Sequence, residues 1–468
     1  MSLPLQELAE SATAESIVRM AFADLGQPSA PVATVVTSLI PSRSLEAGEQ
    51  YRFHFDMTKC IGCRSCEIAC NEQNGNPADI HWRRVGEIEG GTYPNTLRHY
   101  LSMGCNHCLD AECVKGCPVD AYTKDPVTGI VLHSATACIG CQYCVWNCPY
   151  SVPQFNAERG VVGKCDMCHG RLTDGREPAC VNSCPEAAIE IEIVNTAAWR
   201  VDYAAAESPG MPAAGHTIST TRITLPLNST TQLERVDTGR IQPEHAHLSL
   251  VFMTTLIQSV TGSLLFALLF DGAQPMLLAL LLVITSIALN ISVFHLGRPA
   301  YAWRAMKMWR RSWLSREVLL FGLFFCAIAA FTFAVWLQHL RLIVLAPPLL
   351  AAIGWMAVAL GIAGTIASAY IYLVPARPAW NMAHTPIDFL LSGLLIGSTL
   401  PVTLDRIAGA FSRLALLQPF HLQATATYPH WLPGLAAVAW IANQTVRLVR
   451  LNRSSLFEDR AAAALMNT

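Results

Sequence analysis

Long apolar runs divide the chain into two halves. About six runs of membrane-spanning length follow residue 247, at 248–270, 275–296, 318–337, 349–372, 387–404 and 431–448. Helices of this length in a soluble core would show polar stripes, and these runs mostly do not. The pattern therefore predicts an all-α transmembrane helical bundle. The sixth run is interrupted by Asn443, Gln444 and Arg447.

The chain ahead of these runs changes composition twice. Residues 51–195 contain nearly all of the cysteines, whereas residues 196–245 are rich in Ala, Ser, Thr, Pro and Gly. The second composition predicts a linker or surface arm, with one short strand at about Thr221–Leu227. Four segments result: an N-terminal extension at 1–50, a cysteine-rich domain at 51–195, the arm at 196–245 and a membrane anchor at 246–468.

The overall composition agrees with a membrane-bound half. Of the 468 residues, 52% are hydrophobic and only 14% are charged, and the charged share is about a quarter in typical soluble domains. The net charge of −2 argues against nucleic-acid binding, which needs a basic patch.

Basic residues predict how the anchor is oriented. The loop after the second run carries six of them: Arg298, Arg304, Lys307, Arg310, Arg311 and Arg316. The C-terminal tail is also basic, and the opposite loops carry few positive charges. The positive-inside rule therefore places this loop and the tail in the cytoplasm. Because an even number of runs separates the loop from residues 51–195, the cysteine-rich domain should lie on the cytoplasmic face of a bacterial inner membrane.

Sixteen of the seventeen cysteines form four tight groups. The groups are Cys60, Cys63, Cys66 and Cys70; Cys105, Cys108, Cys113 and Cys117; Cys138, Cys141, Cys144 and Cys148; and Cys165, Cys168, Cys180 and Cys184. The first and third have the bacterial ferredoxin spacing C-x₂-C-x₂-C-x₃-C, and the others are variants with an insertion beside the third cysteine. Four thiolates for each cubane predict four [4Fe–4S] clusters in an α+β ferredoxin-like four-cluster domain.

Two other uses of the cysteines fit less well. Zinc ribbons use pairs of Cys-x₂-Cys, which leaves the third cysteine of each run unexplained. Disulfides would need an oxidising compartment. In two-cluster ferredoxins the fourth cysteine of a run binds the neighbouring cluster, so a cross-wired domain is expected. The spacing alone leaves open which groups pair.

Several motifs resemble the iron–sulfur subunit of dimethyl sulfoxide reductase-type molybdoenzymes over about residues 50–195. They include Cys105-Asn-His-Cys108, Gly116-Cys117-Pro118 and Lys164-Cys165-Asp-Met-Cys168. The resemblance implies that the first group pairs with the fourth and the second with the third. The clusters would then be held by Cys60, Cys63, Cys66 and Cys184; by Cys70, Cys165, Cys168 and Cys180; by Cys105, Cys108, Cys113 and Cys148; and by Cys117, Cys138, Cys141 and Cys144.

Basic and aromatic residues near the cysteines have two interpretations. Lys164 and Arg171 flank the fourth group, and their charge would raise the reduction potential of a nearby cluster. A solvated or partner-facing position is the alternative. Trp82, Arg83 and Arg84 are candidates for contact with a partner subunit.

The anchor half favours quinone over haem. The interiors of the predicted spans contain no histidine, so no axial pair for a haem b can be assembled. Polar groups gather instead in one loop at the bilayer edge, around His295 and Glu317. A quinol oxidation site needs a hydrogen-bonding group and a proton acceptor, and histidine titrates near neutrality. Interfacial anchoring by Arg and Trp is the alternative.

The same loop carries a second resemblance. Its His-Leu-Gly-x-Pro and Ser-x-Glu pattern resembles the membrane-anchor subunit of the same reductases. That resemblance implies menaquinol-site roles for His295 and Glu317, with Arg298 and Arg304 beside them.

Together these features predict the fused electron-transfer and anchor subunits of a molybdenum oxidoreductase. Quinol oxidation would be the chain's own half-reaction, and electrons would pass through four clusters to a separate catalytic subunit. In the family that subunit holds the molybdopterin and reduces a small oxo-substrate such as a sulfoxide, N-oxide or nitrate. Two alternatives stay open. One is reverse flow, from a formate or sulfur-compound dehydrogenase to quinone, and the other is a membrane scaffold whose clusters only hold structure.

Overall fold

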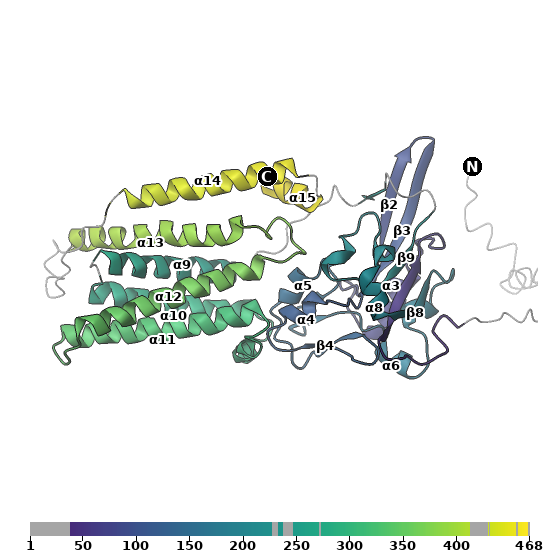
Figure 1. Cartoon of the computed structure of the whole chain (residues 1–468), viewed down its shortest axis with the longest axis horizontal. Coiled ribbons are helices and arrows are strands. Elements are labelled where there is room, and N and C mark those ends of the chain that lie inside the picture. Colours follow the sequence, from purple (N-terminus) through teal and green to yellow (C-terminus); the bar gives the residue numbers. More distant parts are fainter. Residues whose placement is uncertain are drawn as a thin grey trace, which may run out of the picture.

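The computed structural model describes residues 38–226, 233–236, 247–270, 273–411, 429, 431–454 and 457–466. In this part of the chain, strands and short helices gather at one end and long helices at the other (Figure 1). The predicted fold class is confirmed: an α+β ferredoxin-like domain is followed by an all-α bundle. Residues 1–37 of the expected N-terminal extension lie outside the described part.

Short elements build the cysteine-rich half. The strands are β1 (Glu49–Asp56), β2 (Arg84–Thr92), β3 (Asn95–Met103), β4 (Tyr122–Lys124), β5 (Val131–His133), β6 (Gln154–Asn156), β7 (Val161–Gly163), β8 (Ile189–Asn195), β9 (Arg222–Thr224) and β10 (Glu234–Arg235). The helices are α3 (Ser65–Asn74), α4 (Glu112–Gly116), α5 (Tyr143–Asn147), α6 (His169–Thr173), α7 (Ala179–Asn182) and α8 (Thr196–Val201), with turns η1 (Ala204–Ala206) and η2 (Ala214–His216). Each helix from α3 to α7 contains or adjoins a grouped cysteine.

Strand β1 is the centre of a three-stranded sheet ordered β8-β1-β9, antiparallel to β8 and parallel to β9. Alternate residues of its strands, among them Phe53, Phe55, Ile189 and Ile191, are buried in the core of the domain. Strands β2 and β3 form a long hairpin that projects from the domain (Figure 1). The short hairpins β4–β5 and β6–β7 complete the strand pairing.

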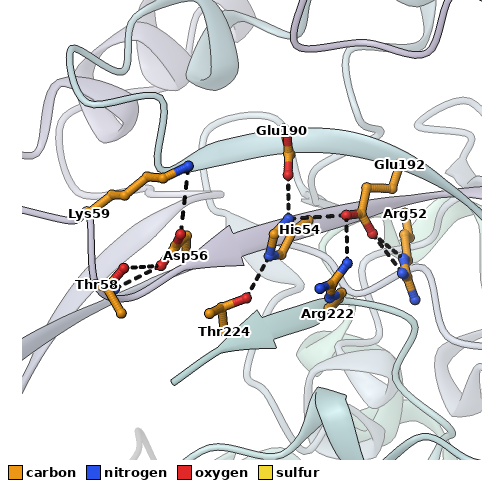
Figure 2. Close-up of polar contacts among 9 residues, drawn as sticks. All are labelled: Arg52, His54, Asp56, Thr58, Lys59, Glu190, Glu192, Arg222 and Thr224. Carbon is orange, nitrogen blue, oxygen red and sulfur yellow. Dashed lines mark hydrogen bonds and ion pairs between the residues drawn. The ribbon is translucent and has the colours of Figure 1, made fainter. Parts of the chain in front are cut away.

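A polar cluster joins the three strands of the central sheet (Figure 2). His54 of β1 binds the carboxylate of Glu190 on β8 through Nδ1. Its Nε2 lies 2.8 Å from the hydroxyl of Thr224 on β9. One histidine ring therefore contacts both neighbouring strands, and it attaches β9 to the domain.

Glu192 of β8 is the charged centre of this cluster. Its carboxylate lies 2.6 Å from Arg52, 3.0 Å from Arg222 and 3.1 Å from Nδ1 of His54. Partial burial would raise the pKa of Glu192, but His54 and Arg52 hold it at about 2. Ligand atoms of His54, Glu190 and Glu192 lie within 4.8 Å of one another. Two arginines already neutralise this trio, which disfavours a metal cation there.

Long helices form the anchor half. They are α9 (Leu248–Leu269), α10 (Pro275–Ser292), α11 (Trp313–His339), α12 (Pro347–Tyr372), α13 (His384–Phe411) and α14 (Leu432–Arg453), followed by the short α15 (Phe457–Met466). Turns η4 (Val293–His295) and η5 (Pro299–Met306) connect α10 to α11. In the described residues, five helices, α9 to α13, are long and apolar enough to cross a membrane. Helix α14 coincides with the predicted sixth run, and its crossing of the membrane stays a prediction.

The polar residues of α14 are paired with α13. Nδ1 of His384 lies 2.8 Å from Oδ1 of Asn443, and Gln444 donates to the Asp388 carboxylate. Arg447 lies 3.6 Å from the same carboxylate. Because these groups satisfy one another, α14 lies along α13 although its sequence is interrupted by polar residues.

Small residues let the anchor helices pack closely. A Cβ atom on Gly262 of α9 would lie 2.0 Å from the carbonyl oxygen of Gly393 on α13. On Gly364 of α12, a Cβ atom would lie 2.5 Å from the ring of Phe321 on α11. Glycine at these contacts allows the backbone or a ring to approach, as is common between membrane helices.

We expect the stability of the central sheet to depend on pH through His54. Hydrogen bonds with Glu192 and Glu190 raise its pKa above the ordinary 6.5, against the opposing effect of burial. The protonated ring therefore stabilises the fold below that pH, and this contribution is lost as pH rises through the raised pKa. His54→Gln should lower the free energy of unfolding by about 1–2 kcal/mol at about pH 6, and by less at about pH 9.

Thermal unfolding followed by circular dichroism measures this difference. His99→Gln, on β3, is the matched control and should leave the pH dependence unchanged. An equal loss of stability at both pH values for His54→Gln would show that the ring acts only by packing.

Candidate electron-transfer site

The two cysteine runs of standard spacing share one backbone conformation. In the first run, Gly62 (φ +73°) and Arg64 (φ +62°) are left-handed. Gly140 (φ +71°) and Gln142 (φ +59°) occupy the same places in the third run. Left-handed residues turn the chain sharply, which gathers the cysteines on either side of them. Arg and Gln adopt this conformation at a cost that is tolerated mainly at functional sites.

Two hollows in the domain are each lined by four cysteines. One is lined by Cys60, Cys63, Cys66 and Cys184, here called set I. Another is lined by Cys105, Cys108, Cys113 and Cys148, here called set III. Each set combines three cysteines of one group with a single cysteine of a distant group.

A third set consists of buried thiols, each of which raises the pKa of its neighbours. Burial raises the pKa of Cys70 to about 12, and the nearby thiols of Cys180 and Cys168 add to this effect. Burial likewise raises the pKa of Cys165, with contributions from Cys70, from Cys105 of set III and from Cys180. Cys70, Cys165, Cys168 and Cys180 are called set II.

The fourth set lies nearest the anchor. Burial raises the pKa of Cys141 to about 12, and the thiols of Cys117 and Cys138 contribute. The same two thiols and Cys141 contribute to the raised pKa of the buried Cys144. Cys117, Cys138, Cys141 and Cys144 are called set IV. The four sets are named as the family resemblance implied them; both this grouping and the cluster that each set would hold stay predictions.

The sets are chemically suited to iron–sulfur clusters. All seventeen cysteines are free thiols, so no disulfide competes for the sulfurs. The amides of Ala121 and Ala188 lie 3.3 Å from the sulfurs of Cys117 and Cys184. Hydrogen bonds from backbone amides stabilise ligated thiolates and tune their clusters.

Two basic residues are buried among the sets. Arg83 exposes 2% of its surface and Lys164 exposes 3%. Arg83 donates to the hydroxyl of Ser102 at 3.2 Å, and Lys164 donates to the carbonyl of Cys165 at 2.8 Å. The expectation that Arg83 meets a partner subunit is therefore wrong, and so is a solvated position for Lys164. At the start of β2 the chain turns Arg83 inward and leaves Arg84 outside.

Residues of the expected arm also reach the cysteines. The hydroxyl of Thr217 donates to the sulfur of Cys108 at 3.1 Å, and that of Thr220 donates to the carbonyl of Asn106 at 2.6 Å. Both threonines are buried. The strand expected at Thr221–Leu227 is β9, and Leu227 lies outside the described residues. The polar composition of 196–226 therefore reflects hydrogen bonds to the cysteine-rich domain.

The loop between α10 and α11 is hydrogen-bonded to the cysteine loop of set IV. The amide of Gly297 donates to the carbonyl of Gly140 at 3.3 Å, and the amide of Arg298 to that of Ile139 at 3.1 Å. This approach requires glycine, because a Cβ atom on Gly297 would lie 2.3 Å from the carbonyl oxygen of Gly160. Set IV is therefore attached directly to the membrane anchor.

His295 and Glu317 approach set IV from different helices. His295 ends η4, and its Nδ1 donates to the carbonyl of Ser292. Glu317 exposes 7% of its surface near the start of α11. Burial raises the pKa of Tyr143, beside Cys144, and Glu317 is near enough to contribute. In the described residues, no hydrogen bond joins His295 to Glu317.

Two arginines expected at a quinone site bind the cysteine-rich domain. Arg298 donates to the carbonyl of Ala135 at 2.8 Å, and Arg304 donates to that of Thr136 at 3.1 Å. Both carbonyls belong to the segment that leads into the third cysteine group. These side chains hold the two halves of the chain together.

Aromatic residues that sequence reasoning missed lie at the same junction. Trp146 of α5 stacks on Tyr372 of α12, with 5.8 Å between ring centroids. It also contacts Trp380 at 5.9 Å and His247 at 6.2 Å. Trp146 lies between Cys144 and Cys148 of the third cysteine group. A tryptophan inside a cysteine group is the sequence signal that could have identified it.

This geometry defines a class: an iron–sulfur electron-transfer protein attached to a membrane anchor. Comparison with known families agrees on both halves. The family described as "4Fe-4S dicluster domain" matches residues 97–193, and that described as "DMSO reductase anchor subunit (DmsC)" matches residues 242–452.

Individual relatives match the cysteine-rich half. A chain of the anaerobic dimethyl sulfoxide reductase of Haemophilus influenzae is 39% identical over 151 residues, which are 30% of this chain and 73% of that protein. YnfG of Escherichia coli, a probable anaerobic dimethyl sulfoxide reductase chain, is 42% identical over 149 residues, 30% of this chain and 72% of that protein. One subunit of the sulfite dehydrogenase of Allochromatium vinosum is 36% identical over 151 residues, 28% and 63% respectively.

The chain therefore belongs to the family of dimethyl sulfoxide reductase iron–sulfur subunits, and it fuses such a subunit to a DmsC-type anchor. It is an iron–sulfur electron-transfer component of a reductase-family complex and a multi-pass membrane protein. The predicted fusion is confirmed.

Gly297→Val should loosen the junction between the two halves. The added side chain would overlap the backbone of Gly160, and overpacking of this kind costs about 1–3 kcal/mol. We expect limited proteolysis of the detergent-solubilised protein to separate the halves several-fold faster, with the iron content unchanged. Gly322→Val on α11 is the control, because a Cβ atom there has no neighbour within 4 Å. Equal proteolysis of both variants would contradict a tight junction.

Proposed function

We propose that this chain oxidises a quinol, such as menaquinol, at the membrane end of its cysteine-rich domain. It passes the electrons through four [4Fe–4S] clusters to a separate molybdopterin-containing subunit, which reduces a sulfoxide, N-oxide or nitrate. The observation that carries the proposal is the backbone contact of Gly297 and Arg298 with the cysteine loop of set IV. Through this contact the segment containing His295 lies against a cluster site.

The four cysteine sets supply the path. When bound, [4Fe–4S] clusters accept and pass on single electrons. The chain's own residues hold four sulfurs for each, donate amide hydrogen bonds to some of them and bury about half of the sixteen cysteines. Set I contains the exposed Cys63 and so lies at the surface, where a catalytic subunit can approach. Set IV adjoins the anchor.

His295 is suited to receive a proton from quinol. A carbonyl oxygen only accepts hydrogen bonds, so the bond to Ser292 places the proton of the neutral ring on Nδ1. Nε2 is then left as the acceptor. Glu317, buried at the start of α11, is the second proton-handling group and relays the proton towards water. Arg298 and Arg304 position the loop. We also propose that the anchor holds no haem b, since His295, His339 and His384 all lie at helix ends.

The iron content tests the four-cluster assignment. Anaerobically purified protein should contain about sixteen irons per chain, four for each set. A Cys141→Ser variant should lose the contribution of set IV, with about four irons fewer, while Cys326→Ser on α11 should lose none. A total of about twelve irons in the unaltered protein would contradict four cubane clusters.

Variants of His295 and Glu317 test the quinol site. In vesicles supplied with menaquinol, His295→Ala and Glu317→Gln should each slow cluster reduction at least about tenfold, because proton removal limits quinol oxidation. Dithionite should still reduce every cluster, as seen by low-temperature paramagnetic resonance. His339→Ala, at the opposite end of α11, is the control. Reduction of His295→Ala by menaquinol at the unaltered rate would exclude this site.

We propose that the cysteine-rich domain faces the cytoplasm and that α14 crosses the membrane as a sixth span. The pairing of its polar residues with Asp388 and His384 supports that crossing. Digestion of the domain by protease added outside spheroplasts would refute the cytoplasmic placement.

Reverse electron flow, from a dehydrogenase subunit to quinone, is a second candidate. The likeness to a sulfite dehydrogenase subunit favours it, because that relative's name describes an oxidising enzyme. Cluster midpoint potentials above that of menaquinone favour quinol oxidation, whereas potentials well below it favour delivery to quinone.

A further inference from the structure

Arg83 is a buried cation whose charge has no carboxylate partner in the described part of the chain. Its side chain donates to Ser102, and its guanidinium lies 4.6 Å from the centre of the Phe53 ring. Its Nε and Nη2 atoms have no hydrogen-bond partner. A Cβ atom on Gly104 would lie 3.3 Å from Nη2, so the guanidinium packs closely against the backbone at Gly104.

The groups that act on this charge are cysteines of two different sets. Cys180, Cys165 and Cys70 of set II and Cys66 of set I favour the charged form of Arg83, and together they outweigh its burial. Ser102 extends the contact, since its hydroxyl lies 3.4 Å from the sulfur of Cys66. Phe53, on which the guanidinium stacks, also belongs to one buried core with Cys66, Cys165 and Cys180. Arg83 therefore lies between the first two cluster sites.

Burial of an unpaired guanidinium is costly unless opposite charge lies nearby. Four thiolates give a cubane cluster a net negative charge, and each added electron increases it. Two such clusters would therefore supply the missing counter-charge on either side of Arg83. A fixed positive charge in this position stabilises the reduced state of each cluster more than the oxidised state.

We propose that Arg83 is a positioning residue shared by sets I and II, whose fixed charge raises the reduction potentials of both clusters. The proposal rests on the assignment of four clusters made above. Each reduction adds one electron to a cluster and needs no proton, because Arg83 stays charged throughout. Ser102 holds the guanidinium towards Cys66, and Phe53 holds its other face.

Lys164 provides an internal comparison. Its ammonium group is buried and donates to the carbonyls of Val131 and Cys165. The thiols that act on it are Cys105 and Cys113 of set III and Cys165 of set II. Lys164 thus lies between sets II and III, as Arg83 lies between sets I and II. Set II adjoins both cations.

Redox titration of the purified full-length protein tests this assignment. The titration is chemical and anaerobic, and low-temperature paramagnetic resonance follows the cluster signals. Arg83→Met should make two of the four clusters harder to reduce, each by about tenfold in the equilibrium constant, which is 59 mV for one electron. Lys164→Met should shift two clusters in the same direction, and one cluster should be common to both variants. Arg98→Gln, which removes a charge from the exposed hairpin, should shift none.

Arg83→Lys keeps the charge and separates charge from shape. In this variant the equilibrium constant for reduction of each cluster should stay within about twofold of its value in the unaltered protein. If Arg83→Met loses iron but Arg83→Lys keeps all of it, the proposal is still supported. Lysine keeps the positive charge at this position, and methionine removes it. Loss of iron from both variants would assign Arg83 a purely structural role.

The inference and the proposed function fail in different ways. Unchanged midpoints in an Arg83→Met protein with full iron content would overturn the inference alone. An equal shift of all four clusters would also overturn it, since a shared residue acts on two. Fewer than four clusters in the unaltered protein would instead refute the proposed function.

Discussion

The structure depends on one backbone-to-backbone contact, between the loop that joins α10 to α11 and the cysteine loop of set IV. Gly297 meets Gly140 and Gly160 so closely that a Cβ atom at any of the three would overlap a neighbouring backbone. Once the backbones meet, nearby polar groups complete the joint: Ser312 of the membrane loop donates to the carbonyl of Gly116 at 2.7 Å. The joint turns a soluble-type cluster domain and a helix bundle into one structure. It also decides which of the four sets lies next to the anchor helices.

Thiolate ligands of clusters would place negative charge in the interior of the domain, and buried cations balance that charge. Arg83 and Lys164 lie in the interior, where ionised groups are expensive, and cysteines of adjacent sets surround each of them. The third interval, between sets III and IV, holds no such cation in the described structure but the neutral Tyr122, buried beside Cys144 and Cys113. The two fully buried cations therefore lie among sets I, II and III.

Sequence patterns predicted the parts of this structure that repeat or that follow hydropathy. Cysteine spacing predicted the two related loops, and apolar runs predicted α9, α10 and α12 to within a few residues, whereas α13 continues to Phe411. Helix α11 begins earlier than its run, at Trp313, because Ser312 and Ser315 bind the cysteine-rich domain and Glu317 is buried there. No local pattern could reveal this, since the partners lie almost two hundred residues away. The inward position of Arg83 is equally non-local: it depends on cysteines from the first and fourth groups, about a hundred residues apart in the chain.

Basic residues in the second membrane loop serve two purposes, which changes how orientation is inferred. Arg298 and Arg304 bind carbonyls of the cysteine-rich domain, and Arg311 lies 3.1 Å from the carboxylate of Asp120. The joint requires these three charges on whichever side of the membrane the domain lies, so they do not by themselves report the positive-inside rule. The C-terminal end of α14 provides cleaner evidence. Arg447 is paired with Asp388, but Arg450 and Arg453 lie in the last turn and are free of the joint between the two halves. If α14 spans the membrane, those two arginines lie on the same side as the cluster domain, which supports the proposed cytoplasmic placement.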